Sequence, residues 1–263
     1  MLVKNKTILL TGASSGIGEA LAYELSARGA RLFLLARDME RLEKVKSQCS
    51  HPELHHCYRV DLLDYHQAAA KTLQILKNHQ KIDILINNAG ISQRSYAKDT
   101  DISVDEKLMA VDYFAPVAMT KALLPHWLQS GHGQVVTVSS IAGIIATPYR
   151  SGYAGAKHAI IGFMDSLRAE SYQQNLVVTM LCPGFIKTGI SVNALIGDGS
   201  TLGSVDKVQA NGMEPAICAR LMVNAIEKDK AMALMGGKER FAVLLNRIFP
   251  ALVRRIMRTA KVR

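Results

Sequence analysis

Two residues four positions apart, Tyr153 and Lys157, have side chains that could carry out proton transfer. On a helix this spacing brings both side chains to the same face. A free phenol has a pKa of about 10, which is too high for a ready base near neutral pH. A nearby ammonium group favours the phenolate and lowers that value. The pair therefore predicts an acid/base that exchanges a proton with a substrate oxygen while hydride moves to or from the same carbon.

A second chemical signal is the glycine-rich segment 11–18, which lies between a predicted strand and a predicted helix. Gly12, Gly16 and Gly18 allow a tight turn and a close approach of the backbone to a ligand. The helix start behind them offers free N–H groups and the positive end of the helix dipole to a pyrophosphate. Because the strand and the helix are both in place, the segment predicts a dinucleotide site rather than a turn without a ligand.

The elements that must position these residues alternate along the chain. Short apolar runs predict strands over 7–11, 31–36, 56–60, 82–86, 135–138 and 176–181. Longer runs with helical periodicity predict helices over 19–27, 39–47, 65–78, 104–129 and 155–173. The strands are apolar on both faces, as buried parallel strands are. The pattern predicts an α/β fold, a single doubly wound Rossmann-like domain over residues 1–263, with helices on both faces of a parallel sheet.

The composition is that of a globular protein. Hydrophobic residues make up 49% of the 263 residues and charged residues 21%, which excludes collagen-like and disordered chains. No apolar run reaches the roughly 20 residues that a membrane span requires. We expect no signal peptide, because a buried strand begins at Thr7. The four cysteines lack metal-binding spacing, so we expect reduced thiols, no metal and a cytoplasmic location.

Together, the motifs resemble those of the short-chain dehydrogenase/reductase family. The similarity rests on segment 11–18, on Asn87-Asn-Ala-Gly90, on Ser140 and on Tyr153-x-x-x-Lys157, in this order and spacing. It implies a nicotinamide cofactor and a homodimer or homotetramer. It also implies that Ser140 donates a hydrogen bond to the substrate oxygen and that Lys157 holds the nicotinamide ribose. The implied cofactor contacts are Gly12, Ser14, Ser15, Gly16, Ile17, Gly18, Asp61, Leu62, Asn87, Ala89, Gly90, Tyr153, Lys157, Pro183, Gly184, Ile186 and Thr188.

The residues after the second predicted strand bear on the choice of nucleotide. An acid at this point would accept hydrogen bonds from a ribose 2′-hydroxyl and repel a 2′-phosphate. The sequence has Ala36-Arg37 instead, and Arg37 can pair with a phosphate through charge-assisted hydrogen bonds. Asp38 follows, at a position that in this family usually points away. We therefore expect NADP(H) rather than NAD(H), the alternative being that Arg37 is a solvated surface charge.

Asp112 departs from the family pattern, which usually has asparagine in this context. The resemblance implies that the backbone carbonyl at this site holds a water that relays protons to the lysine, and aspartate keeps that carbonyl. An ionised carboxylate near Lys157 could strengthen the positive charge of the lysine or partly neutralise its field. We expect Asp112 to act in catalysis and the enzyme to be active with an altered pH profile.

Segments 103–109, 113–121, 148–153 and 191–194 resemble the member 7B-like branch of the family, near the hydroxysteroid dehydrogenases. The resemblance implies a lipophilic carbonyl or alcohol substrate and, in many relatives, membrane association. The candidate substrate contacts are Ser140, Ile141, Ile145, Tyr149 and Phe185. Segment 188–212 is rich in glycine, serine and aspartate, which predicts either a substrate lid or a plain mobile loop.

The tail over 239–263 is basic. Residues 220–263 hold eleven Lys or Arg and three acids, a net charge of +8 out of +10 for the whole chain. Apolar residues recur at helical spacing, and Pro250 predicts two short helices rather than one. A basic amphipathic helix can lie on an anionic membrane. The simpler interpretation is a terminal helix packed on the body or on a dimer mate. Few aromatic residues and no evident reading helix argue against a nucleic-acid partner.

These observations predict an NADP(H)-dependent oxidoreductase that acts on CH–OH groups and interconverts a lipophilic ketone and a secondary alcohol. The alternative is a non-catalytic NADP-binding protein that acts through its basic tail at a membrane or a protein partner. The presence of Ser140, Tyr153 and Lys157 favours the enzyme, and Asp112 is the feature that favours the alternative.

Overall fold

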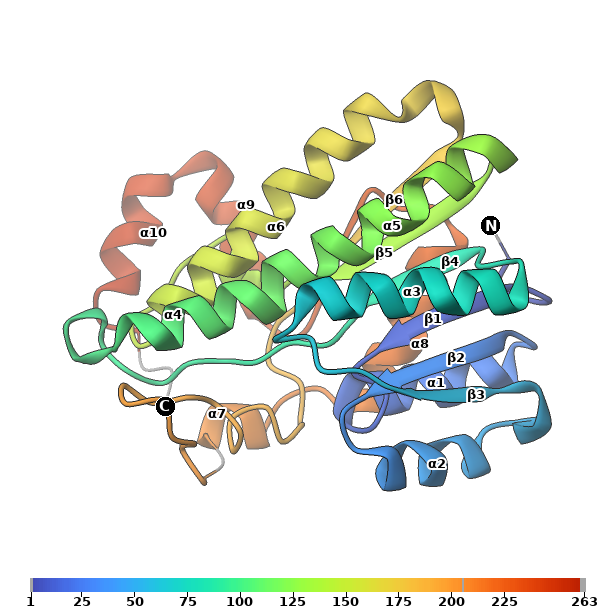
Figure 1. Ribbon diagram of the computed structural model, residues 1–263. Coiled ribbons are helices and arrows are strands. Elements are labelled where there is room, and N and C mark those ends of the chain that lie inside the picture. The colour runs from blue at the N-terminus through green and yellow to red at the C-terminus, as the bar shows by residue number, and fades with distance from the viewer. Residues whose placement is uncertain (1, 205, 261–263) are drawn as a thin grey trace.

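The computed structural model describes residues 2–204 and 206–260 and arranges their strands in one seven-stranded sheet (Figure 1). The spatial order is β3-β2-β1-β4-β5-β6-β7, and every neighbouring pair is parallel. The strands are β1 (Thr7–Thr11), β2 (Arg31–Ala36), β3 (His56–Arg59), β4 (Ile84–Asn87), β5 (Gly133–Val138), β6 (Leu176–Pro183) and β7 (Met232–Met235). The strand order reverses between β1 and β4, and doubly wound folds bind ligands beyond the carboxyl ends of the strands at such a point.

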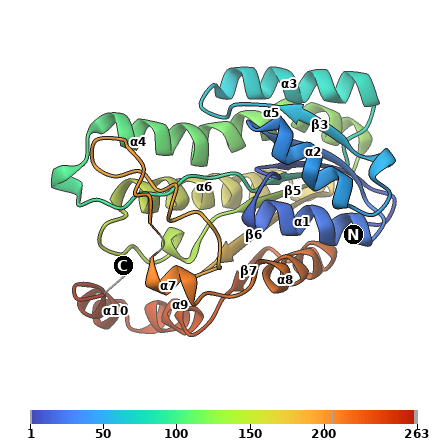
Figure 2. The same cartoon turned by 90° about the horizontal axis from the view of Figure 1, so that it is seen from below.

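Helices cover both faces of this sheet (Figures 1 and 2). Helices α1, α2 and α8 pack on one face, and α3, α5 and α6 pack on the other. The α-helices are α1 (Gly16–Ala27), α2 (Met39–Gln48), α3 (Tyr65–His79), α4 (Ile102–Met109), α5 (Ala115–Ser130), α6 (Ser151–Glu170), α7 (Lys207–Ala210), α8 (Pro215–Glu227), α9 (Glu239–Ile248) and α10 (Pro250–Met257). The arrangement confirms the predicted Rossmann-like fold.

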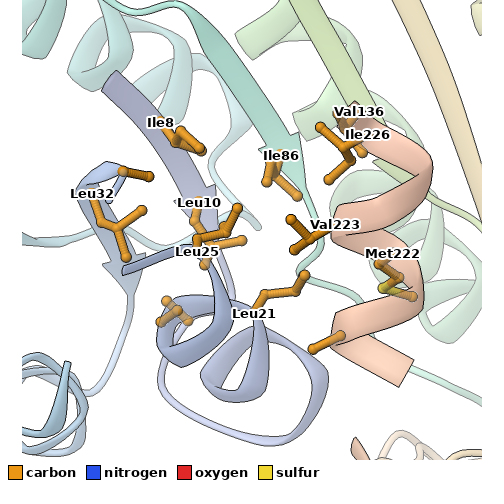
Figure 3. Packing of buried hydrophobic residues seen from close by; sticks show 14 of the residues in the cluster. Ile8, Leu10, Leu21, Leu25, Leu32, Ile86, Val136, Met222, Val223 and Ile226 are labelled. Atoms are coloured by element: carbon orange, nitrogen blue, oxygen red, sulfur yellow. The ribbon is translucent and has the colours of Figure 1, made fainter. Parts of the chain in front are cut away.

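The central strands β1 and β4 are buried along their whole length because each faces two cores. Ile8 and Leu10 of β1 face α1 and α8, where Leu21 and Val223 pack with them (Figure 3). Leu9, which lies between them in the sequence, points to the opposite face and joins the core under α3, α5 and α6. Successive side chains of a strand point to opposite faces, so a strand buried on both faces needs an apolar residue at every position.

The helix predicted over 104–129 is present as one helical run from Ile102 to Ser130 that contains a π-helical turn. Helix α4 is followed by a π-helical turn, Ala110–Phe114, and then by α5. Asp112 lies inside this turn. A π-helical turn inserts an extra residue into the helical ladder and is common at functional sites. The prediction of a long helix is therefore confirmed, and the π-helical turn lies at the position where the sequence departs from the family pattern.

The sequence-based prediction missed one strand, β7, and two helices, α7 and α8. The sheet has a seventh strand, β7, at its edge beside β6, and α8 precedes it. Strand β7 has only four residues and is partly exposed, so its signal is weaker than those of the fully buried strands. Helix α6 begins at Ser151, four residues earlier than predicted, and ends at Glu170.

The tail consists of two short helices, α9 and α10, which meet at Pro250 as predicted. Their bounds confirm that this proline ends one helix and starts the next. All four cysteines are free thiols. In the part of the chain that the structure describes, no helix combines the length and the hydropathy needed to cross a bilayer.

Candidate active site

Three segments bring the predicted catalytic side chains together at the carboxyl edge of the sheet. Ser140 follows β5, Asp112 lies in the π-helical turn, and Tyr153 and Lys157 lie on α6. The Nζ atom of Lys157 donates to the carbonyl oxygen of Val138 at 3.1 Å, which ties α6 to the end of β5. The same Nζ atom lies 5.8 Å from the centre of the Tyr153 ring. The predicted helical pair is therefore buried beside the end of the sheet.

The two serines after β5 have different partners. The hydroxyl of Ser139 donates to the carbonyl oxygen of Lys157 at 3.0 Å, so it fastens helix α6 to the strand. The hydroxyl of Ser140 accepts from the N–H of Ala142 at 3.1 Å and donates to the carbonyl oxygen of Pro183 at 3.3 Å. Ser140 thus stands between the ends of β5 and β6, and its proton can turn toward another acceptor.

Asp112 is buried beside Lys157. Its Oδ2 atom lies 3.8 Å from Nζ of Lys157, and its Oδ1 atom accepts the N–H of Ile91 at 3.0 Å. Burial raises the pKa of Asp112 to about 6, although the charge of Lys157 and the hydrogen bond from Ile91 both act to lower it. Gly90 lies against this pair, because a Cβ atom there would be 3.2 Å from Nζ of Lys157.

Gln93, which the sequence-based prediction missed, caps the helix that carries Tyr153. Its Oε1 atom accepts the N–H of Gly152 at 2.8 Å and the N–H of Tyr153 at 3.3 Å. Its Nε2 atom donates to Ser95 and Thr100 at 3.2 and 3.0 Å. A helix start has N–H groups without partners inside the helix. Gln93 supplies that partner from 59 residues away, so local pattern could not reveal it.

The glycine-rich segment has the shape of a phosphate cradle. A Cβ atom on Gly18 would lie 2.0 Å from the carbonyl oxygen of Gly12, and Gly12 and Gly16 both have positive φ. Ser15, the N-cap of α1, makes no side-chain hydrogen bond to the first turn within the described residues. The N–H groups at the helix start, those of Gly16 and Ile17 among them, are therefore available to an anion. The segment, with Ser14, fits a dinucleotide phosphate.

Strand β4 locks this segment in place. The hydroxyl of Thr11 accepts the N–H groups of Asn88 and Ala89, each at 3.0 Å. The Nδ2 atom of Asn88 donates to the carbonyl oxygen of Thr11 at 2.9 Å. Asn87, predicted to flank the cofactor, is buried, and its Nδ2 atom donates to Thr120 and Thr137 inside the fold. Its observed role is to join β4 to β5 and α5.

The residues after β2 and β3 lie at the same edge of the sheet. Arg37 is exposed. Asp38 is engaged locally, because its side chain accepts the N–H of Arg41 at 3.0 Å and caps α2. Asp61 is exposed and accepts the N–H of Leu63, while Leu62 is buried in the core under α3. Arg37 is thus an exposed cation at the end of β2, beside an acid that already has a partner.

The segment after β6 reaches across to the glycine-rich segment. A Cβ atom on Gly16 would lie 3.2 Å from Cγ2 of Thr188, and Thr188 donates to the carbonyl oxygen of Ile186. Gly184, which follows Pro183, donates its N–H to Met235 of β7 at 2.7 Å. The predicted cofactor contacts Gly16 and Thr188 are therefore neighbours in the fold.

Glu239 of the tail also reaches the segment after β6. Its Oε1 atom accepts the N–H of Phe185 at 3.1 Å and that of Gly237 at 3.0 Å. A Cβ atom on Gly184 would collide with this carboxylate. Glu239, the first residue of the basic tail, therefore bonds to the segment after β6, a contact that the sequence did not indicate.

The predicted substrate contacts have unequal surroundings. Ile141 and Ile145 are buried in a cluster with Val243 of α9 and Val253 of α10. Tyr149 has a positive φ, and its hydroxyl donates to the hydroxyl of Tyr96 at 2.7 Å. The Phe185 ring lies 5.5 Å from the guanidinium carbon of Arg150.

Segment 188–212 is attached to the body by a buried ion pair. Nε of Arg94 donates to Oδ2 of Asp206 at 2.7 Å, and both side chains are 5% exposed or less. Arg150, three residues before Tyr153, approaches the same oxygen at 3.9 Å. Burial, and next the charge of Arg94, lower the pKa of Arg150 to about 10. The sequence-based prediction missed this group because its members are far apart in the chain.

Comparisons with known proteins agree with this geometry. Residues 6–196 match the family model described as short chain dehydrogenase. Dehydrogenase/reductase SDR family member 7B of Mus musculus is 40% identical over 261 residues, which cover 97% of this chain and 81% of the relative. A solved short-chain dehydrogenase from Streptomyces avermitilis has a TM-score of 0.84 at 25% identity and covers 99% of this chain and 100% of its own. A metagenomic short-chain oxidoreductase in complex with NADP has a TM-score of 0.71 at 26% identity, with coverages of 89% and 98%.

Proposed function

The chain belongs to the short-chain dehydrogenase family of oxidoreductases, and from that premise we propose that it is an NADP(H)-dependent enzyme that interconverts a lipophilic ketone and a secondary alcohol. One observation carries the proposal. Ser140, Tyr153 and Lys157 meet at the carboxyl edge of the sheet, beside a glycine-rich segment shaped for a dinucleotide phosphate. A Rossmann-like fold alone would not specify this chemistry.

The side chains divide the work of proton transfer. Tyr153 exchanges a proton with the substrate oxygen. Lys157 places a positive charge beside the tyrosine ring, and the carbonyl of Val138 fixes the position of that charge. Ser140 donates a hydrogen bond to the same substrate oxygen once its hydroxyl turns away from Pro183. When bound, the nicotinamide would supply or accept the hydride.

The proposed preference for NADP(H) rests on Arg37. This side chain is exposed at the end of β2, and the neighbouring acid, Asp38, is occupied as the cap of α2. A 2′-phosphate there would meet a cation and no free carboxylate. The metagenomic relative that was solved with NADP supports the same choice. Arg37→Ala should weaken NADPH binding by about tenfold to a hundredfold, the scale of a hydrogen bond to a charged group, and leave NADH binding unchanged. Lys44→Ala, which removes an exposed cation from α2 that is not at the end of β2, is the matched control.

The proposed lipophilic substrate follows from the walls around the site. Ile141 directly follows Ser140, and Ile145 packs in the same cluster. Tyr149 directly precedes Arg150 in the sequence, and the Phe185 ring lies 5.5 Å from the guanidinium carbon of Arg150. Segment 188–212 would act as the lid, held by the pair of Arg94 and Asp206.

A homodimer or homotetramer is part of the proposal, and light scattering on the purified protein tests it.

Asp112 supports a second candidate, a non-catalytic NADP-binding protein. A buried carboxylate 3.8 Å from Lys157 can offset the charge on which proton transfer depends. NADPH oxidation against a panel of ketones, from small dicarbonyls to keto-steroids and keto-lipids, separates the two candidates. Turnover of the lipophilic members supports the enzyme. Tight NADPH binding without turnover of any ketone would favour the binding protein.

A further inference from the structure

Helices α9 and α10 turn a continuous apolar surface to solvent. One side of each helix is fixed to the body, because Val243 and Val253 are buried with Ile141 and Ile145. The other side carries large apolar side chains that are 47% to 70% exposed: Phe241, Leu244, Ile248, Phe249, Leu252 and Ile256. Positions three, four and seven residues apart share one face of a helix. Exposed apolar patches of this kind mark interaction sites.

Arginines border this surface on both helices. The exposed cations are Arg240, Arg247, Arg254, Arg255 and Arg258. Among the described residues, none of them takes part in a salt bridge. No Asp or Glu follows Glu239 in the sequence, and the carboxylate of Glu239 is occupied by Phe185 and Gly237. The surface therefore combines apolar side chains with positive charge that no salt bridge among the described residues offsets.

We propose that the outward faces of α9 and α10 form a docking surface for a membrane that contains anionic lipid. The apolar side chains enter the boundary between headgroups and acyl chains, and the arginines pair with lipid phosphates. A second copy of the chain matches this surface less well. A symmetric interface between two copies would bring both sets of these arginines, and no acid from α10, into one contact, and an excess of like charge opposes association.

The docking surface lies close to the candidate active site. The buried sides of α9 and α10 pack on Ile141, which directly follows Ser140, and on Ile145. Both views place α10 at the same end of the molecule as α4 and α7 (Figures 1 and 2). Docking would therefore hold the site next to the bilayer, where a lipophilic ketone is concentrated. That consequence rests on the proposed function, whereas membrane docking can be tested without measuring catalysis.

Flotation of the purified full chain with lipid vesicles tests the proposal. We expect the protein to float with vesicles of phosphatidylcholine and phosphatidylserine at low salt, to float far less at high salt, and to stay behind with phosphatidylcholine alone. Arg247→Gln with Arg254→Gln should weaken partitioning by about fivefold for each arginine, which corresponds to about 1 kcal/mol per cation near the lipid surface. Leu244→Ser with Ile248→Ser should weaken it as well, because the apolar contact is lost.

Matched variants keep the test specific. Lys44→Gln with Lys77→Gln removes two exposed cations from α2 and α3, and Leu73→Ser with Leu128→Ser removes two comparably exposed leucines from α3 and α5. Both control pairs should float like the wild type. The proposal is overturned if the wild type does not float with anionic vesicles at low salt, or if the controls lose as much binding as the tail variants. A solution dimer that Leu244→Ser with Ile248→Ser dissociates would also overturn it, because the surface would then be a subunit interface.

Discussion

The Oδ2 atom of Asp112 lies 3.8 Å from Nζ of Lys157, and both side chains are at most 5% exposed. The two groups are close enough to attract, yet Oδ2 has no hydrogen-bond partner among the described residues. Desolvation outweighs the attraction, so the pKa of Asp112 rises from 3.8 to about 6. The charge next to the proposed tuning lysine therefore depends on pH within the working range of many enzymes.

The free energy of unfolding should depend on pH because of the Asp112 carboxyl group. Its pKa is raised in the folded state, so the folded chain holds the proton more tightly than the unfolded chain between pH 3.8 and about 6. The free energy of unfolding then falls as pH rises through that window. The raised pKa corresponds to a loss of up to about 3 kcal/mol. Urea unfolding across the window should show this fall in the wild type and a flatter curve in Asp112→Asn. Asp165→Asn, an exposed acid on α6, should behave like the wild type.

The rate of ketone reduction should follow the same titration. Neutral Asp112 leaves the charge of Lys157 unopposed, which favours transfer of the phenolic proton to the substrate oxygen. Reduction is therefore expected to be several-fold faster below about pH 6 than above it, and Asp112→Asn should keep the faster rate at higher pH. Steady-state pH–rate curves measure this. An Asp112→Asn curve identical to that of the wild type would make Asp112 a passive replacement for asparagine.

Gln93 is expected to act as a positioning residue for Tyr153. Gln93→Ala leaves the N–H groups of Gly152 and Tyr153 without their acceptor, at a cost of about 1–3 kcal/mol for a buried group that loses its partner. The first turn of α6 should then loosen, and kcat should fall more than KM changes. Gln134→Ala is the matched control, because Gln134 is equally buried but bonds Thr179 and Ile226 away from the site. Loss of stability without the kcat effect would reduce Gln93 to a structural role.

Two glycines should respond in opposite ways to alanine. Gly18→Ala places a Cβ atom 2.0 Å from the carbonyl oxygen of Gly12, so we expect loss of nucleotide binding and a lower melting temperature. A Cβ atom on Gly162 meets nothing within 4 Å, and this position is exposed within α6. Gly162→Ala should stabilise the protein by about 0.5–1 kcal/mol, because alanine is the better helix former. Calorimetry and NADPH titration of both variants check the pair, and tight NADPH binding by Gly18→Ala would contradict the cradle described above.

The sequence predicted those structural features that depend on the residues of a single strand, helix or turn. Strands β1, β2 and β5 are nearly continuous apolar runs, and their burial on both faces follows from that pattern. Pro250 divides the tail as expected, because proline cannot continue a helix. The glycine-rich segment was recognisable because it stands between a strand and a helix.

What the sequence could not reveal depends on contacts between distant segments. The early start of α6 requires Gln93, and the attachment of segment 188–212 requires Arg94 to meet Asp206, 112 residues away. The π-helical turn at Asp112 lies inside one continuous helical run, so the pattern predicted the helix but not the turn within it. The tail pattern correctly indicated an amphipathic segment. It did not indicate which apolar residues pack on the body, and in the structure these are chiefly Val243 and Val253.

The central claim is that Tyr153 is the acid/base of a ketone reductase, and one comparison tests it most directly. Initial rates of NADPH oxidation are measured with the best ketone of the panel for the wild type and for Tyr153→Phe, together with the NADPH dissociation constant of each. The account predicts a rate at least about a hundredfold lower in the variant, the scale of a lost general acid, with unchanged nucleotide affinity. A Tyr153→Phe variant that turns over the ketone at the rate of the wild type would contradict it.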